Sequence, residues 1–115
     1  MSVRVEIDVA LLEFMQRYAN TLLKWDIVTL FGENPHIRDV AANIAMRLSR
    51  SQPAVARELE DLMLLGLLRR ARLPSGAVYQ LTDDPELRQN LARFVRDYRR
   101  PYNAAGLLQN QPRAR

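Results

Sequence analysis

The chain has 115 residues, of which 17 are basic and 13 acidic, and a formal net charge of +4 at pH 7. This length suits a single domain with a core of its own. With no cysteine and one histidine, the sequence excludes disulfides and thiolate metal sites and offers no catalytic set of side chains. We therefore expect neither an enzyme, nor a cofactor, nor a bound metal ion.

The charge is unevenly distributed along the chain. Residues 1–46 carry a formal charge of −2, whereas residues 47–82 and 83–115 each carry +3, and every basic residue except Lys24 is an arginine. A positive C-terminal two-thirds suits a polyanionic partner, because phosphate neutralisation with counterion release drives non-specific nucleic-acid binding. Solubility together with an arginine-rich codon bias explains the same charge equally well.

The apolar segments do not resemble a signal or a membrane span. Glu6 and Asp8 interrupt the stretch where a secretory signal needs an apolar run. The longest apolar run, over residues 62–68, is far shorter than the roughly 20 residues that cross a bilayer. We expect a cytoplasmic protein with no membrane partner.

Apolar spacing predicts three helices in the first half of the chain. The first follows Asp8 and extends to about residue 19, and the second, over residues 22–32, is apolar over most of its circumference. His36 and Ile37 then leave room for a very short strand. Asp39 is expected to cap a third helix, whose inward-facing residues are Val40, Ala41, Ile44, Ala45 and Leu48.

The next helix is predicted over residues 52–65 and begins and ends at defined places. Ser51 can accept a hydrogen bond as the N-cap, Pro53 suits the first turn, and Gly66 can adopt the left-handed conformation that ends a helix. Two apolar-faced helices joined by about three residues form a helix-turn-helix. The buried stripe of the second helix is expected to be Val55, Leu59 and Leu62.

A hairpin and a last helix complete the pattern. Two extended runs flank the turn sequence Pro-Ser-Gly at residues 74–76, and Arg70 and Arg72 share one face of the first run. A helix is then expected from Pro85 to about Arg99. Its apolar stripe and that of the first helix predict a homodimer through Leu12, Met15, Leu87, Leu91, Phe94, Val95 and Tyr98.

This order of elements is that of a winged helix-turn-helix domain. The stretch IAMRLSRSQPAVARELEDLMLLGLLRRARLPSGAVYQLT, residues 44–82, resembles the motif region of ArsR-like and MarR-like bacterial regulators. Ser51 matches the family's cap, and Leu65-Gly66-Leu67-Leu68 matches the turn into the wing. Ser49 departs from the glycine that is common there, and the chain lacks the Cys and His clusters of metal-sensing members.

The resemblance implies a mainly α fold with a small β-hairpin and flanking N- and C-terminal helices. We expect an N-terminal arm and flanking helix over residues 1–20 and a winged helix-turn-helix DNA-binding domain over 21–82. Residues 83–100 are then a C-terminal dimerisation helix, and residues 101–115, which turn to Pro, Asn, Gln and Ala, a flexible tail.

By this resemblance the chain is expected to be a sequence-specific DNA-binding transcriptional regulator that acts as a homodimer on double-stranded DNA. Helix 52–65 would enter the major groove, and the wing over residues 67–82 would lie on the adjacent groove or backbone. The residues predicted to contact DNA are Arg50, Ser51, Gln52, Pro53, Ala54, Arg57, Arg69, Arg70, Arg72 and Ser75.

Each of these predictions has an alternative. Arg57 can address a guanine, or it can pair with Glu60 or Asp61 within its own helix. Arginines on the hairpin can contact phosphates, or they can protect an edge strand from aggregation. For the whole chain, the alternative is a winged helix that serves as a protein interaction module or assembly subunit, in which Leu64 meets another polypeptide.

Overall fold

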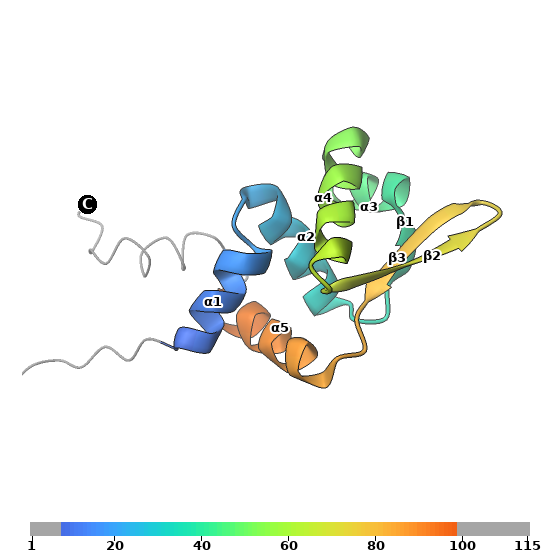
Figure 1. The fold of residues 1–115 in the computed structure, drawn as a ribbon. Coiled ribbons are helices and arrows are strands. Elements are labelled where there is room, and N and C mark those ends of the chain that lie inside the picture. Colours follow the sequence, from blue (N-terminus) through green and yellow to red (C-terminus); the bar gives the residue numbers. More distant parts are fainter. Residues whose placement is uncertain (1–7, 99–115) are drawn as a thin grey trace, which may run out of the picture.

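The computed structural model describes residues 8–98, so the predictions for the arm before Asp8 and for the tail over 101–115 lie outside the described residues. Five helices and three strands follow one another in this part of the chain (Figure 1). They are α1 (Val9–Tyr18), α2 (Leu22–Glu33), β1 (Arg38–Val40), α3 (Ala41–Leu48), α4 (Gln52–Leu64), β2 (Leu68–Leu73), β3 (Gly76–Leu81) and α5 (Pro85–Tyr98).

Side-chain caps fix where four of the helices begin. Asp8, Thr21 and Ser51 each accept a hydrogen bond from the backbone NH three residues further on, at 3.1, 3.0 and 3.3 Å. Asp84 accepts one at 2.9 Å from the NH two residues on. Each cap satisfies an NH group that has no partner inside the helix, and all four follow from the local sequence.

The beginning of α3 corrects one prediction. Asp39 is not the cap of this helix: it lies within β1, opposite Tyr79 of β3, and Val40 holds the cap position without a side-chain bond. The Asp39 carboxylate instead accepts hydrogen bonds from the Val40 backbone NH and the Asn43 amide, both at 2.8 Å. Strand pairing continues through Val40, so α3 begins at Ala41, one residue later than expected.

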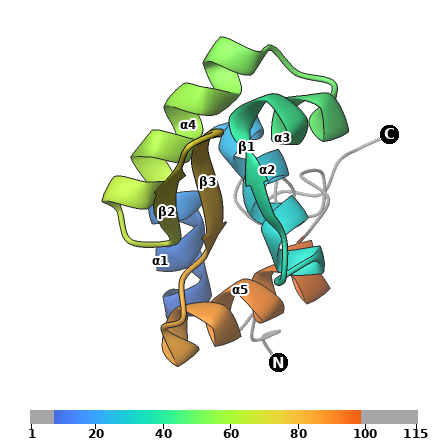
Figure 2. The ribbon, with the colours of Figure 1, turned by 90° about the vertical axis from the view of Figure 1, so that its right-hand side faces the viewer.

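The sheet has three strands rather than the two of a simple hairpin. β1 and β2 both pair antiparallel with β3, in the order β1-β3-β2. The short strand predicted at His36 and Ile37 falls instead at residues 38–40. Its pairing joins the hairpin to the segment that precedes the helix-turn-helix, and Figure 2 shows the three strands side by side in front of α2.

Two left-handed residues shape the helix-turn-helix. Ser49, at φ 56°, ends α3 where glycine is common in the resembling family, and the next NH, that of Arg50, donates to the Ala45 carbonyl at 3.0 Å. Gly66, at φ 91°, ends α4 as predicted and sends the chain into β2. The two turns set the directions in which α4 and the hairpin leave the core.

The core lies around α2, as predicted for the buried spine, with Ile27, Val28 and Phe31 fully buried. At the end away from the hairpin tip, α1 and α5 pack on it (Figure 1). Phe94 of α5 contacts the ring of Trp25 at a centroid distance of 5.1 Å, and the Trp25 indole NH donates to the Tyr98 carbonyl at 3.0 Å. The flanking helices therefore belong to the same core.

Within residues 8–98, no helix is both long enough and apolar enough to cross a bilayer.

Candidate nucleic-acid interface

α4 has a buried face and an outward face, as its sequence predicts. Val55, Leu59 and Leu62 are fully buried. Gln52, Pro53 and Arg57 are exposed, as is the cap Ser51, and Ala54 is half-buried. The first two turns of the helix therefore offer polar groups to a partner. The N-terminal end of a helix also favours a negatively charged partner through its free NH groups.

Arg57 is uncommitted on this surface. Its side chain forms no hydrogen bond or ion pair with any residue over 8–98. The alternative prediction, an ion pair with Glu60 or Asp61, is wrong, because both carboxylates bind groups on other elements.

Lys24 of α2 holds two of the three carboxylates of α4. Its ammonium lies 3.0 Å from Glu58 Oε1 and 2.6 Å from Asp61 Oδ2, and the residue is only 8% exposed. Burial lowers the pKa of Lys24, but the hydrogen bonds that its ammonium donates to Asp61 and Glu58 outweigh this effect and raise the pKa above its ordinary value. Sequence reasoning missed this contact. The only signal was a single lysine inside a helix that is otherwise largely apolar.

Glu60, the third carboxylate, ties α4 to the hairpin. Its Oε2 accepts a hydrogen bond from the Tyr79 hydroxyl at 2.6 Å and another from the Arg70 guanidinium. The Tyr79 bond and then the Arg70 bond lower the pKa of Glu60. Burial, followed by the Glu60 bond, raises the pKa of the Tyr79 hydroxyl. Arg70 therefore acts between helix and wing rather than as a free surface charge.

Two more of the predicted arginines also have carboxylate partners. Arg50 Nη2 lies 2.6 Å from Asp26 Oδ2 of α2, and Arg69 pairs with Asp83 beyond β3. Both pairs are exposed, and such pairs contribute little stability, so they exchange readily for a phosphate. Arg72 is exposed on β2, and its side chain has no hydrogen bond or ion pair within the described part of the chain.

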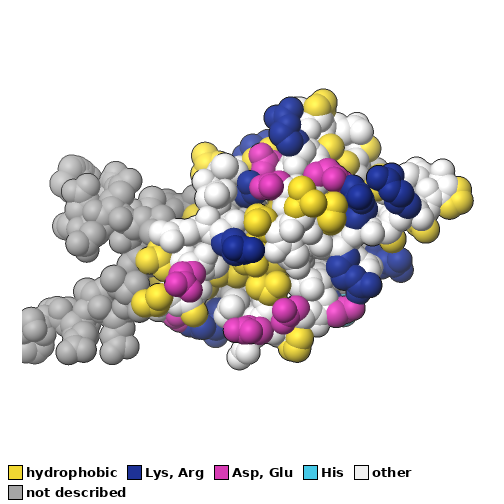
Figure 3. All heavy atoms as spheres, viewed as in Figure 1, with side chains coloured by type: hydrophobic (Ala, Val, Ile, Leu, Met, Phe, Trp, Pro, Cys, Tyr) yellow, Lys and Arg dark blue, Asp and Glu magenta, His cyan; other side chains and the backbone are white. Residues whose placement is uncertain are grey.

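The hairpin arginines lie on two faces of the sheet. Arg70 and Arg72 share one face, as predicted, and the structure turns this face to α4. Arg69 lies on the opposite face because side chains alternate along a strand. Ser75 is exposed in the turn at the tip. Figure 3 shows basic side chains over the hairpin and at the beginning of α4, with acidic ones between them.

The residues predicted for a dimer interface fall into two groups. Met15, Leu91 and Phe94 are at most 3% exposed and pack inside the single chain. The other four are partly exposed: Leu12, Leu87, Val95 and Tyr98. The described residues include no group of three or more His, Cys, Asp or Glu side chains that could hold a metal ion. His36 is exposed in the loop before β1.

Comparison with solved structures identifies the fold. HlyU from Vibrio cholerae superposes with a TM-score of 0.63 at 19% identity, over 84% of this chain and all of that one. ZitR from Lactococcus lactis gives 0.56 at 19% identity, over 94% and 86% of the two chains. The transcriptional regulator BldR from Sulfolobus solfataricus gives 0.51 at 21% identity, over 90% and 74%.

Neither a family model nor a curated protein sequence matches the chain. Of these structural neighbours, BldR is a transcriptional regulator. The superposed shares of this chain, 84%, 94% and 90%, extend beyond the central motif. The chain thus has the winged helix-turn-helix fold of the ArsR-like and MarR-like regulators that its sequence resembles.

Proposed function

We propose that the chain is a sequence-specific DNA-binding transcriptional regulator that acts in the cytoplasm as a homodimer. α4 enters the major groove of double-stranded DNA, and the wing over residues 67–82 lies on the adjacent groove or backbone. One observation carries the proposal. Arg57 is exposed and uncommitted near the beginning of α4, while every acidic group of that helix is bound to a cation on another element.

The engagement of the acidic groups removes the main electrostatic objection to this role. Free carboxylates at Glu58, Glu60 and Asp61 would repel the phosphate backbone. Lys24 on α2 and Arg70 on the wing offset two of these three negative charges. The exposed first turns of α4 and the exposed Arg72 then present a surface whose own charge is positive.

The homodimer would form through the flanking helices. Leu12 of α1 and Leu87, Val95 and Tyr98 of α5 are partly exposed apolar residues outside the helix-turn-helix. Two-fold symmetry would place two copies of α4 about 34 Å apart, one turn of DNA, so the target is an inverted repeat. Sedimentation at micromolar concentration is expected to give the mass of two chains. A mass of one chain contradicts the dimer.

Gel shifts on genomic fragments over a salt series test DNA binding. Arg57→Ala and Arg72→Ala are each expected to weaken binding, and loss of a phosphate contact reduces the salt slope by about 1. Arg96→Ala is the matched control, because Arg96 is exposed on α5 and, among residues 8–98, pairs only with Asp97, its neighbour in sequence. The absence of binding at low salt would contradict the proposal.

Leu64 favours a second function, that of a protein interaction module. Its side chain is 76% exposed near the end of α4, outside the buried stripe of that helix. An exposed leucine is common and is weak evidence alone. If the chain binds protein rather than DNA, Leu64→Ser abolishes that association. If the chain is a DNA-binding regulator, the same variant binds DNA as tightly as the unchanged protein.

A further inference from the structure

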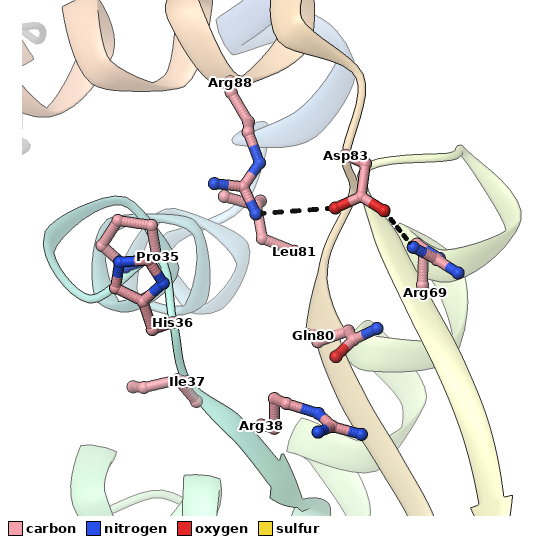
Figure 4. Close-up of a pocket in the computed structure, with 9 residues that line it drawn as sticks. All are labelled: Pro35, His36, Ile37, Arg38, Arg69, Gln80, Leu81, Asp83 and Arg88. Carbon is pink, nitrogen blue, oxygen red and sulfur yellow. Dashed lines mark hydrogen bonds and ion pairs between the residues drawn. The ribbon is translucent and has the colours of Figure 1, made fainter.

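A pocket of about 180 Å³ lies at the base of the hairpin, on the sheet face turned away from α4. Arg38, Gln80 and Arg69 occupy one row across β1, β3 and β2, with Gln80 paired to both arginines. Because adjacent strands lie about 4.8 Å apart, the two arginines stand on either side of the Gln80 amide. All three side chains line the pocket (Figure 4).

A third guanidinium enters from α5. Arg88 Nε donates to the Thr82 carbonyl at 2.7 Å, and this bond orients the rest of the group. Asp83 lies between Arg88 and Arg69, 3.9 Å from the former and ion-paired with the latter (Figure 4). The guanidinium groups of Arg88 and Arg69 are therefore held in place before any ligand arrives, which lowers the entropy cost of binding.

The charges in the pocket do not balance. Arg38, Arg69 and Arg88 bring three positive charges, and Asp83 brings the only negative charge among the lining residues. The Arg38 side chain forms no hydrogen bond or ion pair with any residue in the described range. Two positive charges thus remain uncompensated among the residues that line the pocket.

We propose that this pocket binds the phosphate group of a small phosphate monoester. Such a group carries a charge of about −1.5 to −2 at pH 7 and three acceptor oxygens, which match the excess charge and the planar donors. The volume is below the roughly 300 Å³ of pockets for drug-sized ligands, so it suits the phosphate head rather than a large molecule. His36 also lines the pocket.

The site shares Arg69 and Gln80 with the wing proposed for DNA, but it includes neither Arg57 nor Arg72. Arg57 and Arg72 lie on α4 and on the α4-facing side of the hairpin, whereas the pocket opens on the opposite sheet face. A bound phosphate would join all three strands to the first turns of α5. It would therefore tie the base of the wing to a flanking helix.

Inorganic phosphate is the probe, titrated into the full chain with the arginine Nε–H and Gln80 amide NMR signals as readout and chloride at equal ionic strength as reference. The signals of Arg38, Arg69, Arg88 and Gln80 are expected to shift and saturate at millimolar phosphate. Arg38→Gln should raise the Kd about tenfold, which is about 1.4 kcal/mol. Arg47→Gln, at an exposed arginine on α3 outside the pocket, should leave the Kd unchanged.

Three results would overturn the site. Shifts that rise linearly without saturation, or equally in chloride, mean a general ionic effect. Saturation that Arg38→Gln does not alter places the anion elsewhere. If double-stranded DNA shifts these NMR signals and inorganic phosphate does not, the row of Arg38, Gln80 and Arg69 binds the DNA backbone instead. Because the phosphate titration contains no DNA, its outcome is independent of whether the chain is a DNA-binding regulator.

Discussion

Lys24 supplies the positive charge that two carboxylates in the acidic half of α4 share. Lys24→Met keeps the aliphatic stem but leaves Glu58 and Asp61 without their shared cation. Hydrogen bonds to charged groups contribute about 1.5–3 kcal/mol. We expect urea denaturation at pH 7 to show a loss of about 1–3 kcal/mol in the free energy of unfolding. Arg47→Met, at an exposed arginine without an ion pair in the described range, should change it little.

The same contact predicts a dependence on alkaline pH. The pKa of Lys24 is raised in the folded chain, so its contribution is fully present below the ordinary pKa of 10.5 and is lost as the pH rises through the raised value. The stability difference between the unchanged chain and Lys24→Met should therefore shrink above about pH 10.5. A difference that stays constant up to pH 12 would contradict the contact.

At the residue scale, the sequence predicts what is local. The caps Asp8 and Ser51 follow from a carboxylate or hydroxyl just before an apolar repeat, because the donor is three residues away. The partners of Glu60 and Asp61 could not be predicted in this way. Those carboxylates bind Arg70 and Lys24 on other elements, so the nearby Arg57 was the only partner that sequence spacing offered.

At the scale of elements, the Glu60 contact holds α4 to the wing. The hydrogen bonds from Tyr79 and Arg70 lower the pKa of Glu60. Its contribution to stability is therefore present above the ordinary pKa of 4.5 and is lost as the pH falls through the lowered value. Urea midpoints between pH 7 and pH 3 should fall less steeply in Glu60→Gln than in the unchanged chain. Glu13→Gln, at an exposed residue of α1, is the matched control.

A second contact between elements is the close approach of α2 and α5. A Cβ on Gly32 would overlap Val95 Cγ2 and lie 3.1 Å from Leu91 Cδ1. Overpacking costs about 1–3 kcal/mol, and the helix propensity of alanine returns at most about 1 kcal/mol. Gly32→Ala should therefore lower the free energy of unfolding by about 1–2 kcal/mol, measured by urea denaturation.

A second substitution, at Val95, distinguishes steric overlap from helix propensity as the cause of the effect at Gly32. Val95→Ala removes the overlapping methyl, so the double variant Gly32→Ala/Val95→Ala should be more stable than the sum of the two single changes predicts. Simple additivity would contradict a direct contact between the two positions.

The sheet shows why elements are harder to predict than caps. The hairpin follows from two extended runs and the Pro-Ser-Gly turn, and it forms at residues 68–81. The third strand, Arg38–Val40, has three residues, too few for an alternating pattern, and its partner lies far along the chain. The anion pocket could not be predicted from the sequence either, because its row of side chains forms only when β1 pairs with β3.

At the scale of the whole molecule, one core supports both the helix-turn-helix with its hairpin and the flanking helices. α1, α2 and α5 pack together around Trp25 and Phe94, while α4 and the hairpin extend from the other end (Figure 1). Leu12, Leu87, Val95 and Tyr98 keep part of their surface exposed, and the proposed homodimer would bury that part. Because the proposed dimer would set the spacing of its two α4 helices, the symmetry of the dimer and the recognition of DNA form a single claim.

Selection of bound sequences from a random double-stranded DNA pool tests that claim most directly. The account predicts enrichment of an inverted repeat with half-sites centred about one helical turn, roughly 34 Å, apart. It also predicts that Arg57→Ala relaxes the preference at one position in each half-site. A pool that shows no enrichment over the input after repeated rounds at low salt would contradict it.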